Sequence, residues 1–381
     1  MRALLLADRS FAWRERLMLS RLEVGLADIG MAITRADPER GDQQQAIGSG
    51  LTSTSIAYRR VGVINSPRAQ ALSLIDQLTR IKPTLEDSPI DVIHAFGDGC
   101  WSLAVELAHR IGACCTLELW SQYSIKLSTR IERRCERTGV HLLWLAPDDP
   151  IRDAVQSRRG AAPCRVARWG VHTPDTGRQW AEVNQNRSIA ILSAGGDAPA
   201  IMRALEGVSH VVRSAPGTLI FLDAKAMAEH DKVWRRAETL GLLENLSVIP
   251  DMEARRELVL RCDLLLLPEA RGEHRTLTLD AMASGMVVIA QRDPLVACLD
   301  NPELAVLVED GDAAAWQSAI SDVLTTPGRA QRVIDAAREF IKQERRASDH
   351  AQSLYDAMTW LTSRDSISIE DVKVGRRQAQ R

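Results

Sequence analysis

The sequence predicts an α/β fold of two similar domains, each built on a parallel β-sheet with helices on its faces. Three observations lead to this prediction. The chain has 381 residues, too many for one ordinary core and suited to two domains of about 150–190 residues. Short apolar runs alternate with amphipathic stretches of helical length. The runs are continuously apolar, as strands buried on both faces are.

Four apolar runs in the first half and six in the second are expected to be strands. In chain order they are Arg2–Ala7, Asp91–Ala95, Cys114–Leu119, His141–Leu145, Ile189–Leu192, Thr218–Leu222, Leu246–Ile249, Asp263–Leu267, Val287–Ala290 and Leu304–Val308. Helices between them include Trp101–Ile111 and Ala313–Leu324. In the second of these helices, Trp316, Ile320 and Val323 recur at helical spacing, which predicts a side that packs into the core.

The domain boundaries follow from a polar segment in the middle of the chain. Residues 173–188, with Pro174 and Gly177, interrupt the strand–helix rhythm and are predicted to link domain 1–172 to domain 189–345. Parallel sheets bind ligands at the carboxyl ends of their strands, so two such halves predict a cleft between two sheets.

Two further segments are expected to be loosely structured. Gly41–Ser55 has few apolar residues and is predicted to be a mobile loop. Residues 363–381 are polar and predicted to be a flexible tail.

Composition excludes several classes of function. The formal charge of −2 gives no reason to expect nucleic acid as a partner, and contact with a membrane surface is not predicted. The apolar run Ala3–Ala7 is too short for a signal-peptide core, and no stretch nears the ~20 apolar residues of a membrane span. Seven cysteines without two-residue spacing predict a reducing, cytoplasmic location and no metal site.

The most informative stretch is RCDLLLLPEARGEHRTLTLDAMASGMVVIA, from Arg261 to Ala290. It predicts a strand, a polar loop, a short helix from about Arg275 to Ser284, and a second strand after Gly285, which can end a helix in the left-handed conformation. The loop Glu269–Arg275 places carboxylates, arginines and a histidine after a strand, where a polar ligand would bind. A solvated charged loop is the alternative interpretation of the loop by itself.

This stretch resembles the family-four retaining glycosyltransferases, which read aDvfvlPS..EgfglvllEAMAsG.PVva here. Leu240–Asp263 and Leu304–Leu324 resemble the family's sequences on either side, and Arg165–Asp175 and Asp91–Leu117 resemble two of its N-terminal segments. The resemblance implies the GT-B architecture, two Rossmann-like domains whose parallel sheets face a cleft. It also implies a final helix at 346–362 that returns to the N-terminal domain.

The resemblance further implies a nucleotide-sugar donor, an acceptor that it does not identify, and no cofactor or metal. The family has two glutamates with seven residues between them. The second falls on Asp280, expected to bind the ribose. The first falls on Gly272, and Glu273, one place later, is expected to contact the donor sugar as the catalytic carboxylate. The remaining residues expected to bind the donor in this stretch are Glu269, Arg271, Arg275 and Thr276.

The diphosphate site departs from the family pattern. The family places an arginine and a lysine after the first strand of the C-terminal domain, where this chain reads LSAGGDAPA from Leu192 to Ala200, without a cation. Gly195 and Gly196 can present backbone N–H groups to a phosphate, and a simple turn is the alternative. Arg271, Arg275 or Arg203 is expected to supply the missing positive charge.

On the acceptor side, His94 matches the first histidine of the family's "HaH", and Phe96 replaces the second. A hydrogen-bonded core histidine is the alternative interpretation of His94. Trp120 ends the next strand, where its ring can stack on a sugar or pack into the core.

Three functions are consistent with these features. The first is a retaining glycosyltransferase that needs no metal. The second is a catalytically inactive protein that kept the transferase fold for binding or scaffolding. The third is another enzyme of the same fold, such as a sugar-nucleotide epimerase.

Overall fold

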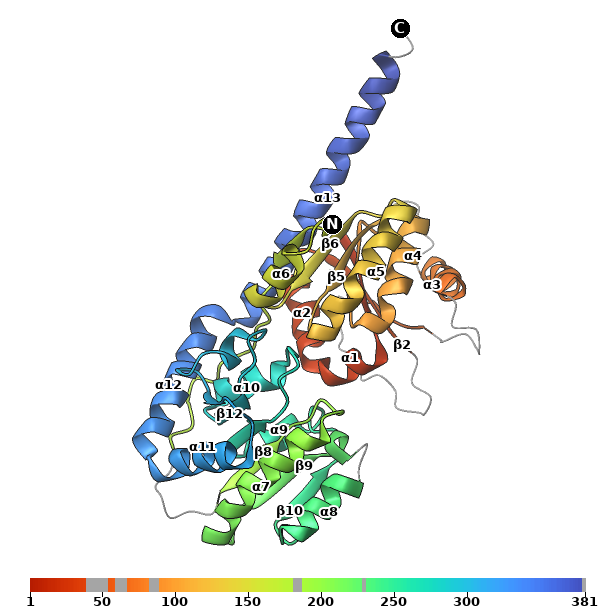
Figure 1. Ribbon diagram of the computed structural model, residues 1–381. Coiled ribbons are helices and arrows are strands. Elements are labelled where there is room, and N and C mark those ends of the chain that lie inside the picture. The colour runs from red at the N-terminus through yellow and green to blue at the C-terminus, as the bar shows by residue number, and fades with distance from the viewer. Residues whose placement is uncertain (39–53, 59–66, 82–88, 181–186, 228–230, 379–381) are drawn as a thin grey trace. The chain divides into compact units, whose positions relative to one another are not determined.

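The computed structural model describes the chain except for residues 39–53, 59–66, 82–88, 181–186, 228–230 and 379–381 (Figure 1). The chain forms two compact units. One consists of Met1–Arg168 together with Ala347–Arg381, and the other of Trp169–Arg346. The predicted mobile loop Gly41–Ser55 lies outside the described residues, apart from its last two, which begin a strand.

The first unit contains a seven-stranded sheet in the order β3-β2-β1-β4-β5-β6-β7, with every neighbouring pair parallel. Its strands are β1 (Arg2–Ala7), β2 (Ala32–Pro38), β3 (Thr54–Tyr58), β4 (Val92–Phe96), β5 (Cys114–Glu118), β6 (Leu142–Ala146) and β7 (Cys164–Val166). The four predicted strands are confirmed to within one residue at each end. The prediction did not include β2, β3 and β7, because their sequences mix polar and apolar residues.

Seven helices of the first unit lie in the described residues: α1 (Arg9–Arg14), α2 (Arg16–Asp28), α3 (Pro67–Ile81), α4 (Trp101–Ile111), α5 (Gln122–Thr138), α6 (Asp149–Gln156) and α13 (Ala347–Gln378). Helices α3, α4 and α5 lie side by side (Figure 1). The sequence ends α4 and α5 with Gly112 and Gly139, each at a left-handed φ of 69° that glycine adopts without strain.

Helix α13 completes the first unit from the far end of the chain. It packs against α2, where Gly25 leaves room for Ala351. Its apolar residues Leu354, Met358 and Leu361 are buried, which confirms the prediction of a returning helix. The helix continues to Gln378, where the sequence analysis predicted a flexible tail from residue 363.

The second unit contains a six-stranded parallel sheet in the order β10-β9-β8-β11-β12-β13. Its strands are β8 (Ser188–Ile191), β9 (Leu219–Asp223), β10 (Leu246–Ile249), β11 (Leu264–Leu267), β12 (Val287–Gln291) and β13 (Val306–Val308). All six predicted strands are confirmed, with ends that shift by at most two residues.

The sheet of the second unit is accompanied by α7 (Ala198–Ser214), α8 (Asp231–Thr239), α9 (Arg256–Val259), α10 (Thr276–Ser284), α11 (Ala313–Thr325) and α12 (Pro327–Glu344). Trp316, Ile320 and Val323 are buried, as their spacing predicted. Helix α11 packs closely on α7, because Gly207 has no side chain: a Cβ at that position would lie 2.6 Å from the Cβ of Trp316.

The predicted linker belongs to the second unit. Arg178 donates hydrogen bonds to the carbonyl oxygens of Cys262 (2.5 Å) and Arg261 (2.8 Å). Arg338 donates to the carbonyl oxygen of Pro174 at 3.0 Å. The unit boundary therefore lies between Arg168 and Trp169, a few residues before the predicted one.

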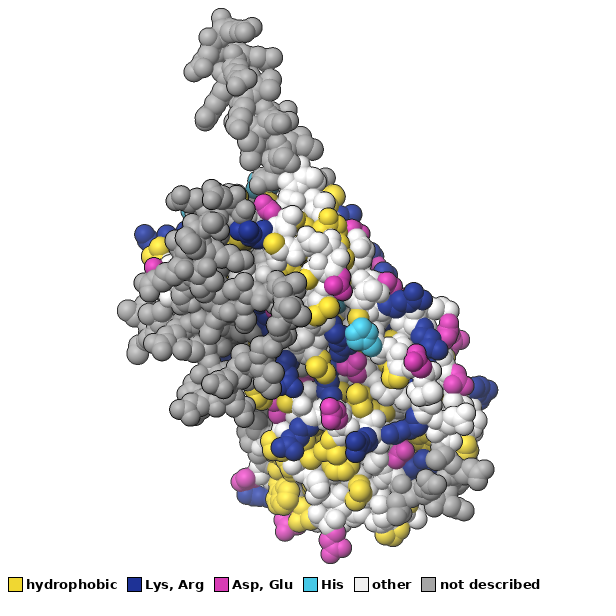
Figure 2. All heavy atoms as spheres, turned by 180° about the vertical axis from the view of Figure 1, so that it is seen from behind, with side chains coloured by type: hydrophobic (Ala, Val, Ile, Leu, Met, Phe, Trp, Pro, Cys, Tyr) yellow, Lys and Arg dark blue, Asp and Glu magenta, His cyan; other side chains and the backbone are white. Residues whose placement is uncertain are grey.

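The surface shows no separation of charge on the face seen in Figure 2, where basic and acidic side chains alternate over the coloured atoms. This mixture agrees with the formal charge of −2. Within the described part of the chain, no helix combines the length and apolarity needed to cross a bilayer.

Candidate functional site

The turn that follows β8 is the centre of the candidate site. It runs from Ser193 to Gly196 and leads into α7, whose first turn is capped by Asp197 accepting a hydrogen bond from the Ala200 N–H at 3.0 Å. Gly195 and Gly196 have positive φ of 76° and 121°. A Cβ on Gly196 would lie 3.1 Å from Nη1 of Arg271, so the second glycine also allows a close approach of that guanidinium.

Glu269 fixes this turn from the end of the neighbouring strand β11. Its Oε2 accepts hydrogen bonds from the Ser193 hydroxyl at 3.0 Å and from the Ala194 N–H at 2.5 Å. The side chain is only 3% exposed. Because the carboxylate is enclosed by the protein, we assign Glu269 to shaping the turn and correct the prediction that it binds the donor directly.

Two cationic side chains from other strands border the turn. Arg271 follows β11, is 42% exposed and donates from Nη1 to the carbonyl oxygen of Gly195 at 3.0 Å. Lys225 follows β9, and its Cβ lies 3.7 Å from the position of a Cβ on Gly195. Its ammonium group contacts Glu253 at 2.8 Å, and the side chain as a whole is 39% exposed. Two cations that follow neighbouring strands of the sheet thus lie beside a turn that carries no cation of its own.

Arg275 is buried and does not line an open surface. It donates to Glu253 at 3.0 Å, to Glu273 at 2.7 Å and to the carbonyl oxygen of Ser193 at 3.3 Å. Burial disfavours its charge, but the two glutamates more than offset this and raise the pKa of Arg275 above its usual value. The prediction that Arg275 contacts a diphosphate is therefore corrected, because its guanidinium is enclosed by protein groups. Arg203 is also engaged elsewhere, with the carbonyl oxygen of Gly311 at 2.7 Å.

The two predicted carboxylates of the motif lie on either side of the start of α10. Glu273 is 20% exposed and is held by Arg275. Asp280 is 12% exposed and forms an ion pair with Arg256 of α9. Between them, Thr276 is fully buried, so its side chain is not available to a ligand, and its predicted role in donor binding is corrected.

Gly272, which occupies the position of the family's first glutamate, has a φ of 64°. Its N–H donates to Asp293 at 2.6 Å. A left-handed residue at this point turns the loop between Arg271 and Glu273, and glycine adopts that conformation without a steric cost.

The two acceptor-side predictions have different outcomes. His94 is completely buried, with Nδ1 2.8 Å from the Thr116 hydroxyl and Nε2 3.6 Å from Glu118. Burial, with a smaller effect of His350, lowers the pKa of His94 to about 3. The core interpretation of His94 is confirmed, and its prediction as an acceptor contact is wrong, because no part of the ring is accessible.

Trp120 lies at the carboxyl end of β5 and contributes to an aromatic and charged cluster. The Arg14 guanidinium lies 4.1 Å from the centre of its ring, and Phe11 meets the ring edge-on at 6.3 Å. Nearby, burial raises the pKa of Asp98, with Asp8 adding to the effect and Arg14 and Trp120 opposing it. The structure places Trp120 at the sheet edge where it was predicted, and its role toward an acceptor stays a prediction.

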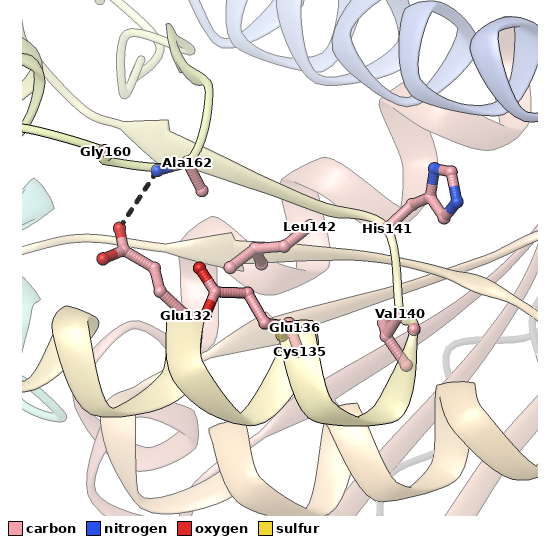
Figure 3. Close-up of a pocket in the computed structure, with 9 residues that line it drawn as sticks. Glu132, Cys135, Glu136, Val140, His141, Leu142, Gly160 and Ala162 are labelled. Carbon is pink, nitrogen blue, oxygen red and sulfur yellow. Dashed lines mark hydrogen bonds between the residues drawn. The ribbon is translucent and has the colours of Figure 1, made fainter.

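A separate cavity of about 340 Å³ opens in the first unit (Figure 3). It is lined by the end of α5, the start of β6 and residues after α6. The cavity therefore lies at the amino end of β6. Glu132 points toward Ala162, whose N–H it accepts at 3.3 Å, and also accepts from the Trp144 indole at 2.9 Å. The Glu132 carboxylate is thus hydrogen-bonded within the fold. The cavity is not the site predicted from the sequence.

Over the described residues, no three or more His, Cys, Asp or Glu side chains are grouped to hold a metal ion. The seven cysteines are all free and buried.

Three residues of the candidate site in the second unit were not predicted: Lys225, Glu253 and Arg256. Lys225 follows the carboxyl end of β9, which pairs with β8 in the sheet. The rule that ligands meet parallel strands at their carboxyl ends would have selected it if the strand order had been known. No sequence signal marked Glu253 or Arg256.

Comparison with known proteins identifies the second unit. Residues 219–340, which contain the loop after β11, Lys225 and Glu253, match the family model described as glycosyl transferases group 1. The match lies wholly within the second unit and covers most of it. It agrees with the resemblance to glycosyltransferases found in the sequence. No curated protein matches the chain by sequence.

Solved structures show the same fold over nearly the whole chain. Sucrose-phosphate synthase from Thermosynechococcus elongatus matches with a TM-score of 0.73 at 12% identity, covering 95% of this chain and 100% of that one. HepE of Anabaena in complex with UDP-glucose matches with a TM-score of 0.66 at 14% identity, covering 94% and 99%. WaaG, a glycosyltransferase involved in lipopolysaccharide biosynthesis, matches with a TM-score of 0.61 at 14% identity, covering 94% and 100%. These likenesses confirm the predicted two-domain α/β fold of GT-B type.

Proposed function

We propose that this protein transfers a sugar from a nucleoside diphosphate sugar to an acceptor, with retention of configuration. The observation that carries the proposal is the turn at Gly195 and Gly196, bordered by the half-exposed cations Arg271 and Lys225. Backbone N–H groups, a helix start and a guanidinium together favour a diphosphate. The structure of HepE with UDP-glucose, which shares the fold, supports the same class of donor.

The residues of the second unit then have separate roles along the donor. Arg271, assisted by Lys225, neutralises the diphosphate and the charge that develops on it as the bond to the sugar breaks. Glu273 contacts the sugar, and Asp280 accepts a hydrogen bond from the ribose. In this arrangement arginine, lysine and backbone groups meet the phosphate charge, so the proposal needs no metal ion.

The experiment is a thermal-shift titration with UDP-, GDP- and ADP-sugars in the presence of a chelator. A donor at 100 times its dissociation constant stabilises the fold by about 2.7 kcal/mol, which is easily seen. We expect one nucleotide to give this shift and Asp280→Asn to reduce it strongly. Asp300→Asn is the matched control, because Asp300 is paired with the exposed Arg292 on another loop.

A wild-type chain that responds to no nucleotide-sugar would contradict the proposal and favour a transferase fold used for another purpose. A response seen only when a divalent cation replaces the chelator would contradict the metal-free part of it.

A further inference from the structure

The segment that follows β10, residues 251–256, carries two charged side chains that contact residues of the candidate site. Asp251 has a φ of 57°, and it alone combines a positive φ with a side chain among the described residues. Its Oδ1 accepts from the Ala254 N–H at 3.2 Å, which closes the turn. A non-glycine residue in this conformation costs free energy and persists where the surroundings require it. This turn leads directly into two charged side chains, Glu253 and Arg256.

The first of these side chains is Glu253, which is fully buried beneath the turn after β8. One carboxylate oxygen accepts from Arg275 at 3.0 Å, and the other contacts the Lys225 ammonium at 2.8 Å. Arg275 in turn donates to Glu273 at 2.7 Å. Glu253 thus reaches the partly exposed carboxylate of Glu273 through one guanidinium.

The second side chain is Arg256, which is 4% exposed. Its guanidinium forms an ion pair with Asp280, and its Nε donates to the carbonyl oxygen of Glu253 at 3.3 Å. Two series of contacts, which we call branches, therefore start from this segment: Glu253–Arg275–Glu273 and Arg256–Asp280. The hydrogen bond from Arg256 to the Glu253 carbonyl connects them.

We propose that residues 251–256 form a positioning segment that sets both donor-site carboxylates, Glu273 through Glu253 and Arg275, and Asp280 through Arg256. The inference rests on the proposed function, in which Glu273 contacts the sugar and Asp280 the ribose. It explains how a chain with the first carboxylate displaced by one residue and the second shortened by a methylene holds both in defined positions. Glu253 and Arg256 act through other residues and do not themselves touch the donor.

The two branches act on different parts of the donor. Loosening the Glu253 branch frees Glu273 and affects the sugar, whereas loosening the Arg256 branch frees Asp280 and affects the nucleoside. A purely structural role would weaken binding of every ligand alike. The ratio between the affinities for a nucleotide-sugar and for the corresponding nucleoside diphosphate therefore separates the two possibilities.

The experiment measures both affinities by calorimetry for the full chain, using the UDP, GDP or ADP pair that the wild type binds. In Glu253→Gln we expect affinity for the nucleotide-sugar to fall about tenfold or more relative to affinity for the nucleoside diphosphate. The ratio is the quantity compared, because Glu253 also pairs with Lys225 beside the diphosphate. In Arg256→Gln we expect both affinities to fall by a similar factor of about tenfold. The rate at which the bound donor is cleaved to nucleoside diphosphate should also fall in Glu253→Gln, because a misplaced Glu273 carboxylate slows the reaction steeply.

Glu206→Gln and Arg236→Gln are the matched controls. These residues form an ion pair with a shortest distance of 2.6 Å between α7 and α8, with the same residue types and no contact to the site. Both controls should leave the two affinities unchanged. If Glu253→Gln does not fold, Glu253→Asp keeps the charge but shortens the side chain, and it carries the same expectation.

The outcomes are distinguishable. A wild type that binds no nucleoside diphosphate overturns the proposed function and the positioning role with it. If the wild type binds and both variants lower the two affinities equally, the positioning role is overturned and the proposed function stands. The same conclusion follows if neither variant changes either affinity.

Discussion

Arg275 and Glu253 form a buried ion pair, with Nη1 of the guanidinium 3.0 Å from Oε1 of the carboxylate. Arg275 is one of three arginines for which a diphosphate contact was expected, and the pair shows why that role does not suit it. A guanidinium enclosed by two glutamates and a carbonyl oxygen has its charge balanced within the protein. The cation available to a ligand is instead Arg271, four residues earlier.

This pair leads to a prediction about stability. Arg275→Met removes the buried partner of Glu253 and leaves that carboxylate paired with the half-exposed Lys225 alone, so we expect a loss of about 3–5 kcal/mol of unfolding free energy. Lys225→Met removes the half-exposed partner of the same carboxylate and should cost about 1 kcal/mol or less. Urea unfolding of the two variants measures the difference. Equal losses would show that the pair is not buried as described.

A second prediction concerns Arg271. Replacing it with alanine should weaken binding of a nucleoside diphosphate about tenfold to a hundredfold, because a charge-assisted contact to phosphate is lost. Arg292→Ala is the control, since Arg292 is similarly exposed (45% against 42%) but is paired with Asp300 on another loop. Calorimetric titration measures both. The assignment of Arg271 fails if the two variants bind alike.

A third prediction concerns the shape of the turn after β8. Gly196→Ala places a Cβ 3.1 Å from Arg271 at a φ of 121°, so it should weaken nucleotide binding as well as lower the thermal midpoint. Gly241→Ala provides the comparison: Gly241 also has a positive φ, of 71°, but a Cβ there would meet nothing within 4 Å. It should lower stability by about 1–2 kcal/mol and leave binding unchanged. A Gly196 variant that binds normally would argue against a phosphate site at this turn.

A fourth prediction tests the packing of α7 on α11. Gly207→Ala adds a Cβ 2.6 Å from that of Trp316 and 2.8 Å from the backbone nitrogen of Gln317, so we expect a loss of about 1–3 kcal/mol from overpacking. Gly328→Ala makes the same change where nothing lies within 4 Å, in the first turn of α12. That variant should be neutral or slightly more stable, since alanine favours helix over glycine. Thermal unfolding distinguishes the two.

A fifth prediction follows from His94, whose pKa is lowered to about 3 by burial. As pH falls below 6.5 the unfolded chain takes up a proton that the folded chain excludes, so stability is full above about pH 6.5 and declines toward pH 3. The slope contributed by one such group approaches about 1.4 kcal/mol per pH unit. Glu118 and His350, which interact with the ring, are both retained in the variant.

The measurement is the thermal midpoint between pH 7 and pH 4. His94→Asn should start lower, because it loses packing, but should fall less steeply with acid. Parallel curves for the variant and the wild type would contradict the assignment of the slope to His94.

Much of the fold was predictable because buried parallel strands are continuously apolar, as in Leu264–Leu267. The strand Ala32–Pro38 was missed because its arginine and aspartate break that pattern. In the site, the motif residues Glu269, Arg271 and Glu273 were predicted from one contiguous stretch.

Lys225 and Glu253 were not predicted, since their contacts join residues far apart in the chain. Those contacts depend on the order β10-β9-β8-β11, which brings the ends of four strands together. A single sequence gives the strands but not their order. For the same reason, the exposure that separates Arg271 from Arg275 could not be predicted.

The division of the chain into one continuous and one discontinuous unit has a consequence during synthesis. Trp169–Arg346 is a single stretch, so this unit contains its complete sheet and core without any later residue. The unit that begins with Met1 must wait for α13, because α2 packs on α13 around Gly25 and Ala351. On the ribosome, the half of the protein that is made first is therefore the half that is finished last.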